Sequence, residues 1–428
     1  MTYKETLAYL YSMLPAYQKI GSKAMKVGLD NILRLATGLG NPHEKYPCIH
    51  VGGTNGKGST SSMIASILQR AGYKVGLYTS PHLVSFTERI RINGQNIPEE
   101  AVVKFVERAR PLIESIQPSF FELTAAMGFA YFAESEVDIA VIEVGLGGRL
   151  DATNIITPEV SVITNISYDH QRLLGDTLAQ IAGEKAGIIK EGKPIVIGET
   201  HPETEGVFQS IASERKAPLI FANQHIDIVS VEASLAGQNI TLRFPRGNQE
   251  AFFLDLLGSY QSKNLRTTLT AIMHLQVNGW EISLTHIKEG LAAVQRLSGL
   301  KGRMQCLQTN PTVLCDTGHN VAGIEEVVKQ LLNQAHKHLR IVWGLVKDKD
   351  ARKMMALLPK SAIYYYVKAR LPRAASAESL YEMGGTLGFK GQVYSSVKEG
   401  YKQALEDAST EDLVFVGGST FVVAEVLE

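Results

Sequence analysis

Short apolar runs alternate with amphipathic stretches of helical length along most of the chain, which predicts units of a strand followed by a helix. An amphipathic helix is expected within residues 1–20, ahead of the first unit. Strands of the first block are expected at 47–52, 74–80, 138–145 and 160–166, and helices at 61–73, 99–115 and 122–134. Strands separated by helices of this length favour a mostly parallel sheet.

The pattern changes in the middle of the chain, where three short runs with polar turns replace the strand–helix units. These runs, at 226–232, 240–244 and 251–257, predict a small antiparallel appendage. Two helices, at 263–277 and 283–297, are expected to close the first block.

The alternation resumes after residue 300 and predicts a second doubly wound, Rossmann-like α/β domain. Its strands are expected at 312–316, 339–346, 362–367 and 413–419, and its helices at 323–337, near Asp350, near Ala377 and at 420–427. Gly299 and Gly302 mark a linker at about 298–302. The expected fold is therefore α/β, with a mostly parallel sheet domain at 1–297 and a smaller domain at 301–428.

Composition indicates an ordinary globular protein of 428 residues, 45% of them hydrophobic. Basic and acidic residues both number 43, which argues against nucleic-acid binding through a bulk positive field. The three cysteines lack C-x-x-C spacing, so they are interpreted as reduced thiols. Neither a signal peptide nor an apolar run of the roughly 18 residues that span a bilayer is evident. A monomeric cytoplasmic protein without a membrane partner is expected.

A glycine-rich turn follows the first strand, with the sequence Gly53-Thr54-Asn55-Gly56-Lys57-Gly58-Ser59. Its backbone N–H groups and the following helix N-terminus suit phosphate oxygens, and Lys57 can reach the β- and γ-phosphates of a nucleotide. The hydroxyl of Ser59 or Thr60 could contact Mg²⁺. A turn without a ligand is the plain alternative, but the Gly-Lys pair between a strand and a helix favours ATP binding.

This loop departs from the common P-loop pattern, because its leading glycine lies close to the Gly-Lys pair and Gly58 separates Lys57 from Ser59. Both departures point to amide-forming ligases with GTNGK loops. Four further segments occur in the order seen in one family: YTSPHLVSFTERIRING at 78–94, EVGLGGRLDATN at 143–154, DHQRLLGDTLAQIAGEKAGIIK at 169–190 and DTGHN at 316–320. From about Gly28 to Phe421 the chain resembles the bifunctional folylpolyglutamate synthase/dihydrofolate synthase family, a branch of the Mur-ligase-like enzymes.

The resemblance implies an ATP-binding first domain that holds the pterin pocket, a glutamate-ligase second domain, and an active site between them. The family activates a carboxylate as an acyl phosphate, which the amino group of L-glutamate attacks. The implied activities are dihydrofolate synthesis from dihydropteroate and extension of the glutamate tail of folates. The GGRLDATN segment resembles bacterial members with both activities, whereas members restricted to tail extension often differ at Arg-Leu-Asp.

Ser80, Glu143 and His170 match the family's magnesium ligands, and Lys185 matches a lysine that CO₂ carbamylates so that it can bind a second metal. The resemblance also allows a monovalent cation. Glu143 stands out by itself, because it ends an apolar strand at the edge where parallel sheets bind ligands. Taken alone, Ser80 could cap a turn, His170 could be an ordinary loop histidine, and Lys185 would be a solvated helix lysine.

On the nucleotide side, Asn264 matches an adenine contact, Arg303 a phosphate contact and Asp316 a further ATP contact. The family form around the arginine is P-G-R-[FL], whereas this chain has Lys301-Gly302-Arg303-Met304. His319 matches an active-site residue of the second domain; without the resemblance, a polar turn after the strand would be favoured.

The family's pterin pocket corresponds to segments 25–27, 119–122 and 150–152. Phe121 could stack on a flat pterin ring, whereas Phe120 is expected in the core. Many bifunctional relatives carry an acidic residue where this chain has Lys26. The expected substrate-binding residues are Ser119, Phe121, Glu122, Leu150, Asp151 and Ala152.

Four other functions remain open at this point. A folylpolyglutamate synthase without the second activity or another Mur-type ligase would keep the chemistry and change the acceptor. An NTP-hydrolysing switch or kinase would turn over ATP without glutamate. A nucleotide-binding regulatory module would lose no catalytic activity on substitution of Lys57 or Glu143.

Overall fold

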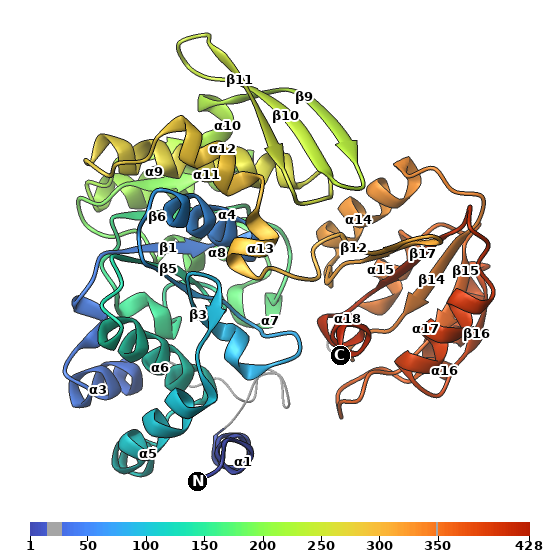
Figure 1. Cartoon of the computed structure of the whole chain (residues 1–428), viewed down its shortest axis with the longest axis horizontal. Coiled ribbons are helices and arrows are strands. Elements are labelled where there is room, and N and C mark those ends of the chain that lie inside the picture. Colours follow the sequence, from blue (N-terminus) through green and yellow to red (C-terminus); the bar gives the residue numbers. More distant parts are fainter. Residues whose placement is uncertain (15–27, 348–349) are drawn as a thin grey trace. The chain divides into compact units, whose positions relative to one another are not determined.

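The computed structural model describes residues 1–14, 28–347 and 350–428 (Figure 1). They form two compact units. The first consists of Met1–Ala233, Gly237–Asp255 and Gln261–Leu300, and the second of Ser234–Ala236, Leu256–Tyr260 and Lys301–Glu428. The chain thus passes between the units not only after Leu300 but also on both sides of Ser234–Ala236 and of Leu256–Tyr260. No linker signal in the sequence indicated these additional passages.

The described part of the first unit contains an eight-stranded sheet of order β4-β3-β2-β5-β1-β6-β7-β8. Strand β1 (Cys48–Gly52) is parallel to both its neighbours, β5 (Ile139–Glu143) and β6 (Val160–Ile163). All three strands are buried, which explains their nearly continuous apolar sequences. The remaining strands are β2 (Val75–Tyr78), β3 (Ile90–Ile92), β4 (Gln95–Asn96), β7 (Ile195–Ile197) and β8 (Leu219–Phe221).

One edge of this sheet is an antiparallel hairpin of β3 and β4 that the hydrophobic pattern did not indicate. Asn93 and Gly94, with φ of 47° and 76°, form its two-residue turn. An Asn-Gly pair between two extended segments is a common hairpin signal. Strands of two or three residues are too short to show a period, so the turn residues were the only signal here.

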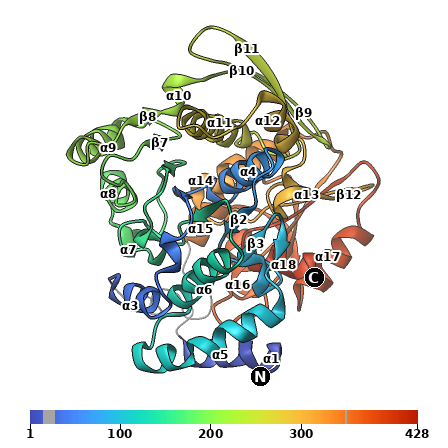
Figure 2. The same ribbon diagram turned by 60° about the vertical axis from the view of Figure 1, so that its left-hand side comes forward.

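Helices cover both faces of the large sheet (Figures 1 and 2). On one face, α4 (Lys57–Arg70) packs against α11 (Gln261–Val277), α12 (Leu284–Leu291) and α13 (Val294–Ser298). Residues Gly58–Leu68 of α4 are all buried, so this helix is enclosed on every side. The other described helices of the unit are α1 (Tyr3–Met13), α3 (Asp30–Gly38), η2 (Pro42–Glu44), η3 (Phe86–Arg89), α5 (Glu99–Ile116), α6 (Phe120–Glu134), η4 (Ala152–Ile155), α7 (Gln171–Leu174), α8 (Leu178–Ala186), α9 (Pro202–Glu214) and α10 (Ala222–His225).

The single helix expected at 283–297 is wrong, because the structure divides it into α12 and α13. Ala293, with φ of −142° and ψ of 30°, leaves the helical conformation. The carboxylate of Asp255 accepts a hydrogen bond of 3.0 Å from the backbone N–H of Gln295, which satisfies a donor in the first turn of α13. A residue distant in sequence therefore starts the second helix.

The appendage predicted for the middle of the chain is confirmed. It is a three-stranded sheet of order β11-β10-β9, with β10 antiparallel to β11. The strands are β9 (Asp227–Ser234), β10 (Gly237–Arg243) and β11 (Gln249–Leu254).

The second unit has a six-stranded sheet of order β12-β13-β17-β14-β15-β16 among its described residues. All pairs are parallel except β12 with β13. Apolar clusters lie on both faces, one with α14, α15 and α16 and one with α17 and α18, so the doubly wound fold is confirmed. Its elements are β12 (Gln305–Thr309), β13 (Thr312–Cys315), α14 (Val321–Asn333), β14 (Leu339–Trp343), α15 (Ala351–Ala356), β15 (Ile363–Tyr366), α16 (Ala377–Leu387), β16 (Lys390–Val393), α17 (Val397–Glu406), β17 (Leu413–Gly417) and α18 (Thr420–Leu427).

The three cysteines are free thiols. Cys48 and Cys315 are buried as small apolar side chains, and burial raises the pKa of the Cys48 thiol to about 12. None of the helices in the described parts of the chain is both long and apolar enough to cross a bilayer.

Candidate active site

The glycine-rich loop leaves the C-terminal end of β1 in the middle of the large sheet and enters α4. Gly56 has φ of +87°, a conformation that side chains disfavour. A β-carbon at this position would overlap Oδ1 of Asn264 on α11. Asn264 and the loop, which are far apart in sequence, are therefore in contact through a glycine that leaves no room for a side chain.

The segment that follows β6 holds the loop in place. The backbone N–H of Thr54 donates to the carbonyl oxygen of Asn165 over 2.9 Å, and that of Asn55 donates to Asn165 Oδ1 over 3.1 Å. The Thr164 hydroxyl donates to the carbonyl oxygen of Asn55 over 2.5 Å. Thr164 and Asn165 were not identified from the sequence, although they come directly after an apolar strand at the ligand-binding edge of the sheet.

Lys57 and Lys185 meet at the start of this loop. Lys57 Nζ donates to the carbonyl oxygens of Gly53 and Thr54, both over 3.1 Å. Lys185 Nζ donates to the same Gly53 oxygen over 2.9 Å. Two amines from different helices thus share one carbonyl acceptor beside the predicted phosphate site.

The alternative interpretation of Lys185 as a solvated helix lysine is wrong. Its side chain is buried, with 4% of the residue exposed, in the last turn of α8. Burial, and secondly the positive charge of Lys57, lower the pKa of the Lys185 amine to about 7. A buried amine with this pKa is available in its neutral, nucleophilic form near neutral pH.

Ser80 and Glu143 lie next to each other because their strands are neighbours in the sheet. Strand β2 is parallel to β5, with Tyr78 opposite Ile142. Ser80 and Glu143 therefore lie at the same edge of the sheet, where these two strands have their carboxyl ends. The backbone N–H of Ser80 donates to Glu143 Oε2 over 3.0 Å. Glu143 is 3% exposed. The Glu143 carboxylate and the Ser80 hydroxyl would offer only oxygen ligands, which fits a hard cation such as Mg²⁺.

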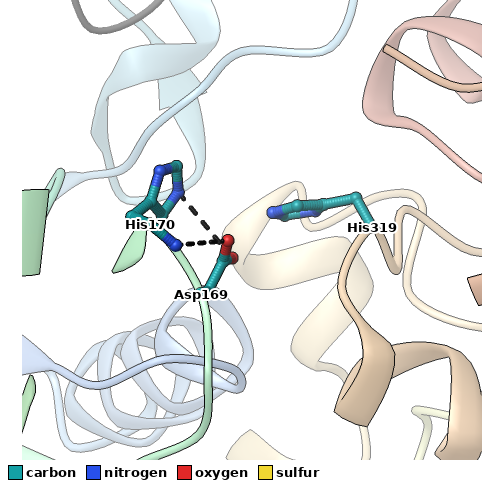
Figure 3. Close-up of side chains that lie close together, drawn as sticks. All are labelled: Asp169, His170 and His319. Carbon is teal, nitrogen blue, oxygen red and sulfur yellow. Dashed lines mark hydrogen bonds and ion pairs between the residues drawn. The ribbon is translucent and has the colours of Figure 1, made fainter. Parts of the chain in front are cut away.

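His170 lies in the loop between β6 and α7, with φ of 52°. Its backbone N–H donates to Asp169 Oδ1 over 2.8 Å, and its Nε2 lies 3.7 Å from Asp169 Oδ2 (Figure 3). The carboxylate of Asp169 therefore faces the imidazole of His170. Asp169 begins the DHQRLLGD segment, but the sequence had not singled it out as a site residue.

Asn264 belongs to a short polar chain that ends at the phosphate loop. Its Nδ2 donates to Gln261 Oε1 over 2.9 Å, and Gln261 Nε2 donates to Ser59 Oγ over 3.2 Å. Gln261 is a site residue missed from the sequence, although its spacing of three from Asn264 places both on one face of α11.

Ser119 and Glu122, both expected in the substrate pocket, bind each other at the start of α6. The N–H of Ser119 donates to Glu122 Oε2 over 2.5 Å, and the N–H of Glu122 donates to Ser119 Oγ over 3.2 Å. This reciprocal pair is a capping box. In the described residues, the clearest role of these two side chains is to fix the first turn of α6, which carries Phe121.

The two phenylalanines differ as the sequence suggested. Phe120 is 4% exposed in the core and stacks on Tyr11 at 5.1 Å between ring centroids. Phe121 is partly buried and meets Tyr78 edge to face at 6.2 Å. The ring of Phe121 also lies so close to Gly145 that a β-carbon there would overlap it. Phe121 therefore touches the loop that follows Glu143.

Asp151 organises that same loop. Its Oδ2 accepts the backbone N–H of Leu146 over 2.8 Å, and its Oδ1 accepts the N–H of Thr153 over 3.0 Å. Of the other expected pocket residues, Leu150 is half-buried and Ala152 is buried in η4. The segment 25–27, including Lys26, lies outside the described residues.

In the second unit, Arg303 lies just before β12 and Asp316 directly after β13. Asp316 Oδ2 accepts the Tyr260 hydroxyl over 2.6 Å and the Met304 N–H over 2.7 Å. Arg303 donates to the Gly302 carbonyl oxygen over 3.3 Å and to the Thr317 hydroxyl. Tyr260, which the sequence did not identify, comes from the short Leu256–Tyr260 segment of this unit.

His319 lies in the turn between β13 and α14. Its Nδ1 lies 3.0 Å from the carbonyl oxygen of Thr317, which can only accept, so Nδ1 carries the proton. The turn that holds Asp316 thus also orients the imidazole of His319.

Comparison with known proteins places the chain in a family. The model of the Mur ligase middle domain matches residues 51–272, and that of the Mur ligase, glutamate ligase domain, matches residues 302–420. The chain is 34% identical over 413 residues to a dihydrofolate synthase/folylpolyglutamate synthase of Bacillus subtilis, covering 94% of each chain. It is 34% identical over 423 residues to a protein of the same description from Escherichia coli, covering 98% of this chain and 95% of the other.

Solved structures agree with these relatives. FolC from Escherichia coli in complex with DHPP and ADP has a TM-score of 0.87 and 33% identity, covering 100% of this chain and 97% of the other. The folylpolyglutamate synthase of Mycobacterium tuberculosis complexed with ADP has a TM-score of 0.88 and 29% identity, with coverage of 99% and 97%. The chain belongs to the dihydrofolate synthase/folylpolyglutamate synthase family of Mur ligases.

Proposed function

We propose that this protein is an ATP-dependent ligase that adds L-glutamate to dihydropteroate, forming dihydrofolate, and to the glutamate tail of folates. The observation that carries the proposal is the convergence of Lys57 and buried Lys185 on the first carbonyl of a phosphate-type loop. The names of the Bacillus and Escherichia relatives combine both activities, and the FolC structure with DHPP and ADP contains a nucleotide.

ATP is proposed to bind with its phosphates on Gly53, Thr54, Asn55, Gly56, Lys57, Gly58 and Ser59. Lys57, at the N-terminus of α4, would release the loop carbonyls and turn to the β- and γ-phosphates, where its charge offsets theirs. Asn264, which borders Gly56, is proposed to contact the adenine. The adenine contact of Asn264 requires the close approach of α11 to the loop that the glycine permits.

Ser80 and Glu143 would hold Mg²⁺, and a second ion would involve His170 and Lys185. Metal bound there would neutralise charge on the phosphoryl group that is transferred. Glu143 is buried and held by the Ser80 N–H, so it could serve as a ligand with little rearrangement. A monovalent cation is proposed from the resemblance to the family alone.

Lys185 is proposed to be carbamylated. The neutral amine would attack the carbon of CO₂, forming a new N–C bond, and the N–H proton would go to solvent. The product is an anion in place of a cation, beside Lys57, whose positive charge would favour it. Burial of the side chain supports the modification, because burial makes the ammonium form of the amine costly.

The reaction would proceed in two steps. The acceptor carboxylate attacks the γ-phosphorus and ADP leaves, giving an acyl phosphate, since phosphate is a far better leaving group than oxide. The neutral amino group of L-glutamate then attacks the acyl carbon, phosphate departs, and the amine loses a proton as the amide forms.

The acceptor is proposed to lie against Phe121, whose flat ring would stack on the pterin, and near Leu150, Asp151 and Ala152. Ser119 and Glu122 would act by holding the first turn of α6.

In the second unit, Arg303 and Asp316 are proposed ATP contacts and His319 an active-site residue. Its Nδ1–H is anchored to Thr317, which fixes the orientation of the imidazole.

The direct test is an acceptor screen with purified protein, ATP, Mg²⁺ and L-glutamate. With either 7,8-dihydropteroate or a reduced folate we expect glutamate-dependent ADP release and a product one glutamate heavier. Product with a folate but never with dihydropteroate would limit the protein to folylpolyglutamate synthesis. A Lacticaseibacillus casei relative that is 33% identical is named a folylpolyglutamate synthase. ATP turnover independent of glutamate would contradict ligation altogether.

The expected monomeric state and cytoplasmic location belong to the same proposal. Light scattering after size-exclusion chromatography would test the first, and fractionation of cells the second.

A further inference from the structure

A chain of three buried polar side chains runs from the central strand of the large sheet to the loop after Glu143. His50 Nε2 on β1 lies 2.8 Å from Thr153 Oγ1, and the Thr153 hydroxyl donates to Asp151 Oδ1 over 2.5 Å. His50 and Thr153 are fully buried and Asp151 is 5% exposed. Polar groups buried this deeply are costly unless each has a partner.

The direction of the hydrogen bonds follows from the donor count. Thr153 has one hydroxyl proton, which it gives to the Asp151 carboxylate, so it must accept from His50. Nε2 of His50 therefore carries the proton, and Nδ1 is the bare nitrogen, which has no hydrogen-bond partner among the described residues. Burial lowers the pKa of His50 to about 3, which keeps the imidazole neutral.

The far end of the chain reaches the proposed acceptor pocket. Asp151 Oδ2 accepts the N–H of Leu146, within the loop that starts immediately after the Glu143 strand. The preceding residue of that loop, Gly145, lies against the Phe121 ring. The position of the Asp151 carboxylate thus sets where the loop backbone sits relative to Phe121.

We propose that His50 and Thr153 are positioning residues for the acceptor: through Asp151 they hold the Gly145–Leu146 backbone and Phe121 in the arrangement that binds the pterin end. Neither residue touches substrate; they act through the loop. The inference rests on the proposed function, because it takes the Phe121 side of the loop to be the acceptor pocket.

The size of the effect follows from the bonds at risk. Without the Thr153 hydroxyl, the His50 N–H loses its acceptor and the carboxylate loses one of its donors. A hydrogen bond to a charged group contributes enough that its loss changes a binding constant roughly tenfold to a hundredfold. The binding affinity for the acceptor should fall and that for ATP should not, because Thr164 and Asn165 hold the phosphate loop.

Thr153→Val removes the hydroxyl and keeps the shape, and Thr153→Ser keeps the hydroxyl as the matched control. We expect Thr153→Val to raise the KM for 7,8-dihydropteroate at least tenfold while the KM for ATP stays within twofold of wild type. Thr153→Ser should stay within about threefold for both substrates. His50→Leu, which removes the donor at the other end, should shift the acceptor KM in the same direction.

A purely structural role would lower the active fraction, and hence kcat, without separating the two KM values. An unchanged acceptor KM in folded Thr153→Val would overturn the proposal, and so would equal increases for acceptor and ATP. If Thr153→Val is not recovered folded, Thr153→Cys decides, since a thiol is a weak donor of similar size. Thr153→Cys should raise the acceptor KM severalfold, and an unchanged acceptor KM would also overturn the proposal.

Failure of the proposed function looks different. If the wild-type protein releases no ADP with dihydropteroate or any folate, the ligase assignment fails before any variant is compared. If the wild-type protein is active and the variants do not differ in acceptor KM, only the positioning role fails.

Discussion

Lys57 and Lys185 donate hydrogen bonds to the same acceptor, the carbonyl oxygen of Gly53, over 3.1 and 2.9 Å. Two ammonium groups so close repel each other, and the charge of Lys57 is one cause of the lowered pKa of Lys185. An anion placed between them would relieve this repulsion. A phosphate at Lys57 and a carbamate on Lys185 would both do so.

Lys57→Ala should abolish nearly all ligase activity, because it removes the charge that faces the transferred phosphoryl group. Loss of a preorganised electrostatic contact in a closed site lowers kcat by about a hundredfold or more. Glutamate-dependent ADP release is the measurement, with the exposed Lys104→Ala as control. Retention of even a tenth of the wild-type rate would contradict a role for Lys57 at the phosphates.

Lys185 should bear a carbamate that Lys185→Arg cannot form. Protein kept in ¹³C-bicarbonate is expected to show one protected carbamate carbon signal by NMR, absent from Lys185→Arg. Lys190→Arg is the matched control, because Lys190 is also partly buried and donates to a backbone oxygen, that of Asn154, over 2.7 Å. A wild-type spectrum without the signal, at full activity, would exclude the modification.

Glu143→Gln should lose activity at least a hundredfold while staying folded. The amide oxygen of glutamine can still accept the Ser80 N–H, so only the negative charge offered to the metal is removed. A Mg²⁺ titration of activity should show a strongly weakened response, whereas Glu134→Gln on the surface should leave it unchanged. Normal Mg²⁺ dependence in Glu143→Gln would refute the metal role.

The fold could be predicted where strands are buried on both faces. The apolar runs of β1, β5 and β6 are unmistakable for this reason, and so are the helices between them. Strand β7 has three residues, and β16 is an exposed edge strand with a polar sequence, so neither shows a period. A strand of three residues is too short to show alternation, and a strand exposed at the edge of a sheet needs no apolar face.

The site could be predicted only as far as its chemistry is local. The phosphate loop is contiguous in sequence, so its motif could be recognised from the sequence alone. The burial of Lys185 depends on the packing of α8 against that loop, and the contact of Asn264 with Gly56 joins positions far apart in the chain. Tyr260 was missed for the same reason, since only folding brings it to Asp316.

The stability of the first unit should fall as the pH drops below 6.5, with His50 as one cause. Its folded pKa of about 3 lies below the unfolded value, so the unfolded chain binds the extra proton and stability is lost with falling pH. The slope contributed by one such group approaches about 1.4 kcal/mol per pH unit. Two other histidines with lowered pKa values, the buried His43 and the partly buried His274, add slopes of the same sign.

The contribution of His50 is isolated by comparing wild type with His50→Gln between pH 7.5 and 5. Urea unfolding can be followed by the fluorescence of Trp280 in a Trp343→Phe background, since the chain has two tryptophans and only Trp280 lies in the first unit. The variant should show a shallower fall in unfolding free energy. Parallel curves for both proteins would show that His50 is not held neutral.

Gly56→Ala should impair ATP binding far more than a strained backbone alone would. The position combines φ of +87° with overlap of any β-carbon and Asn264 Oδ1. Gly72→Ala is the matched control, because Gly72 has φ of +93° but open space around it. Both substitutions should lower the melting temperature through strain of about 1–2 kcal/mol, but only Gly56→Ala should raise the KM for ATP, by tenfold or more. Equal ATP KM values for the two variants would mean that contact between α11 and the loop does not shape the nucleotide site.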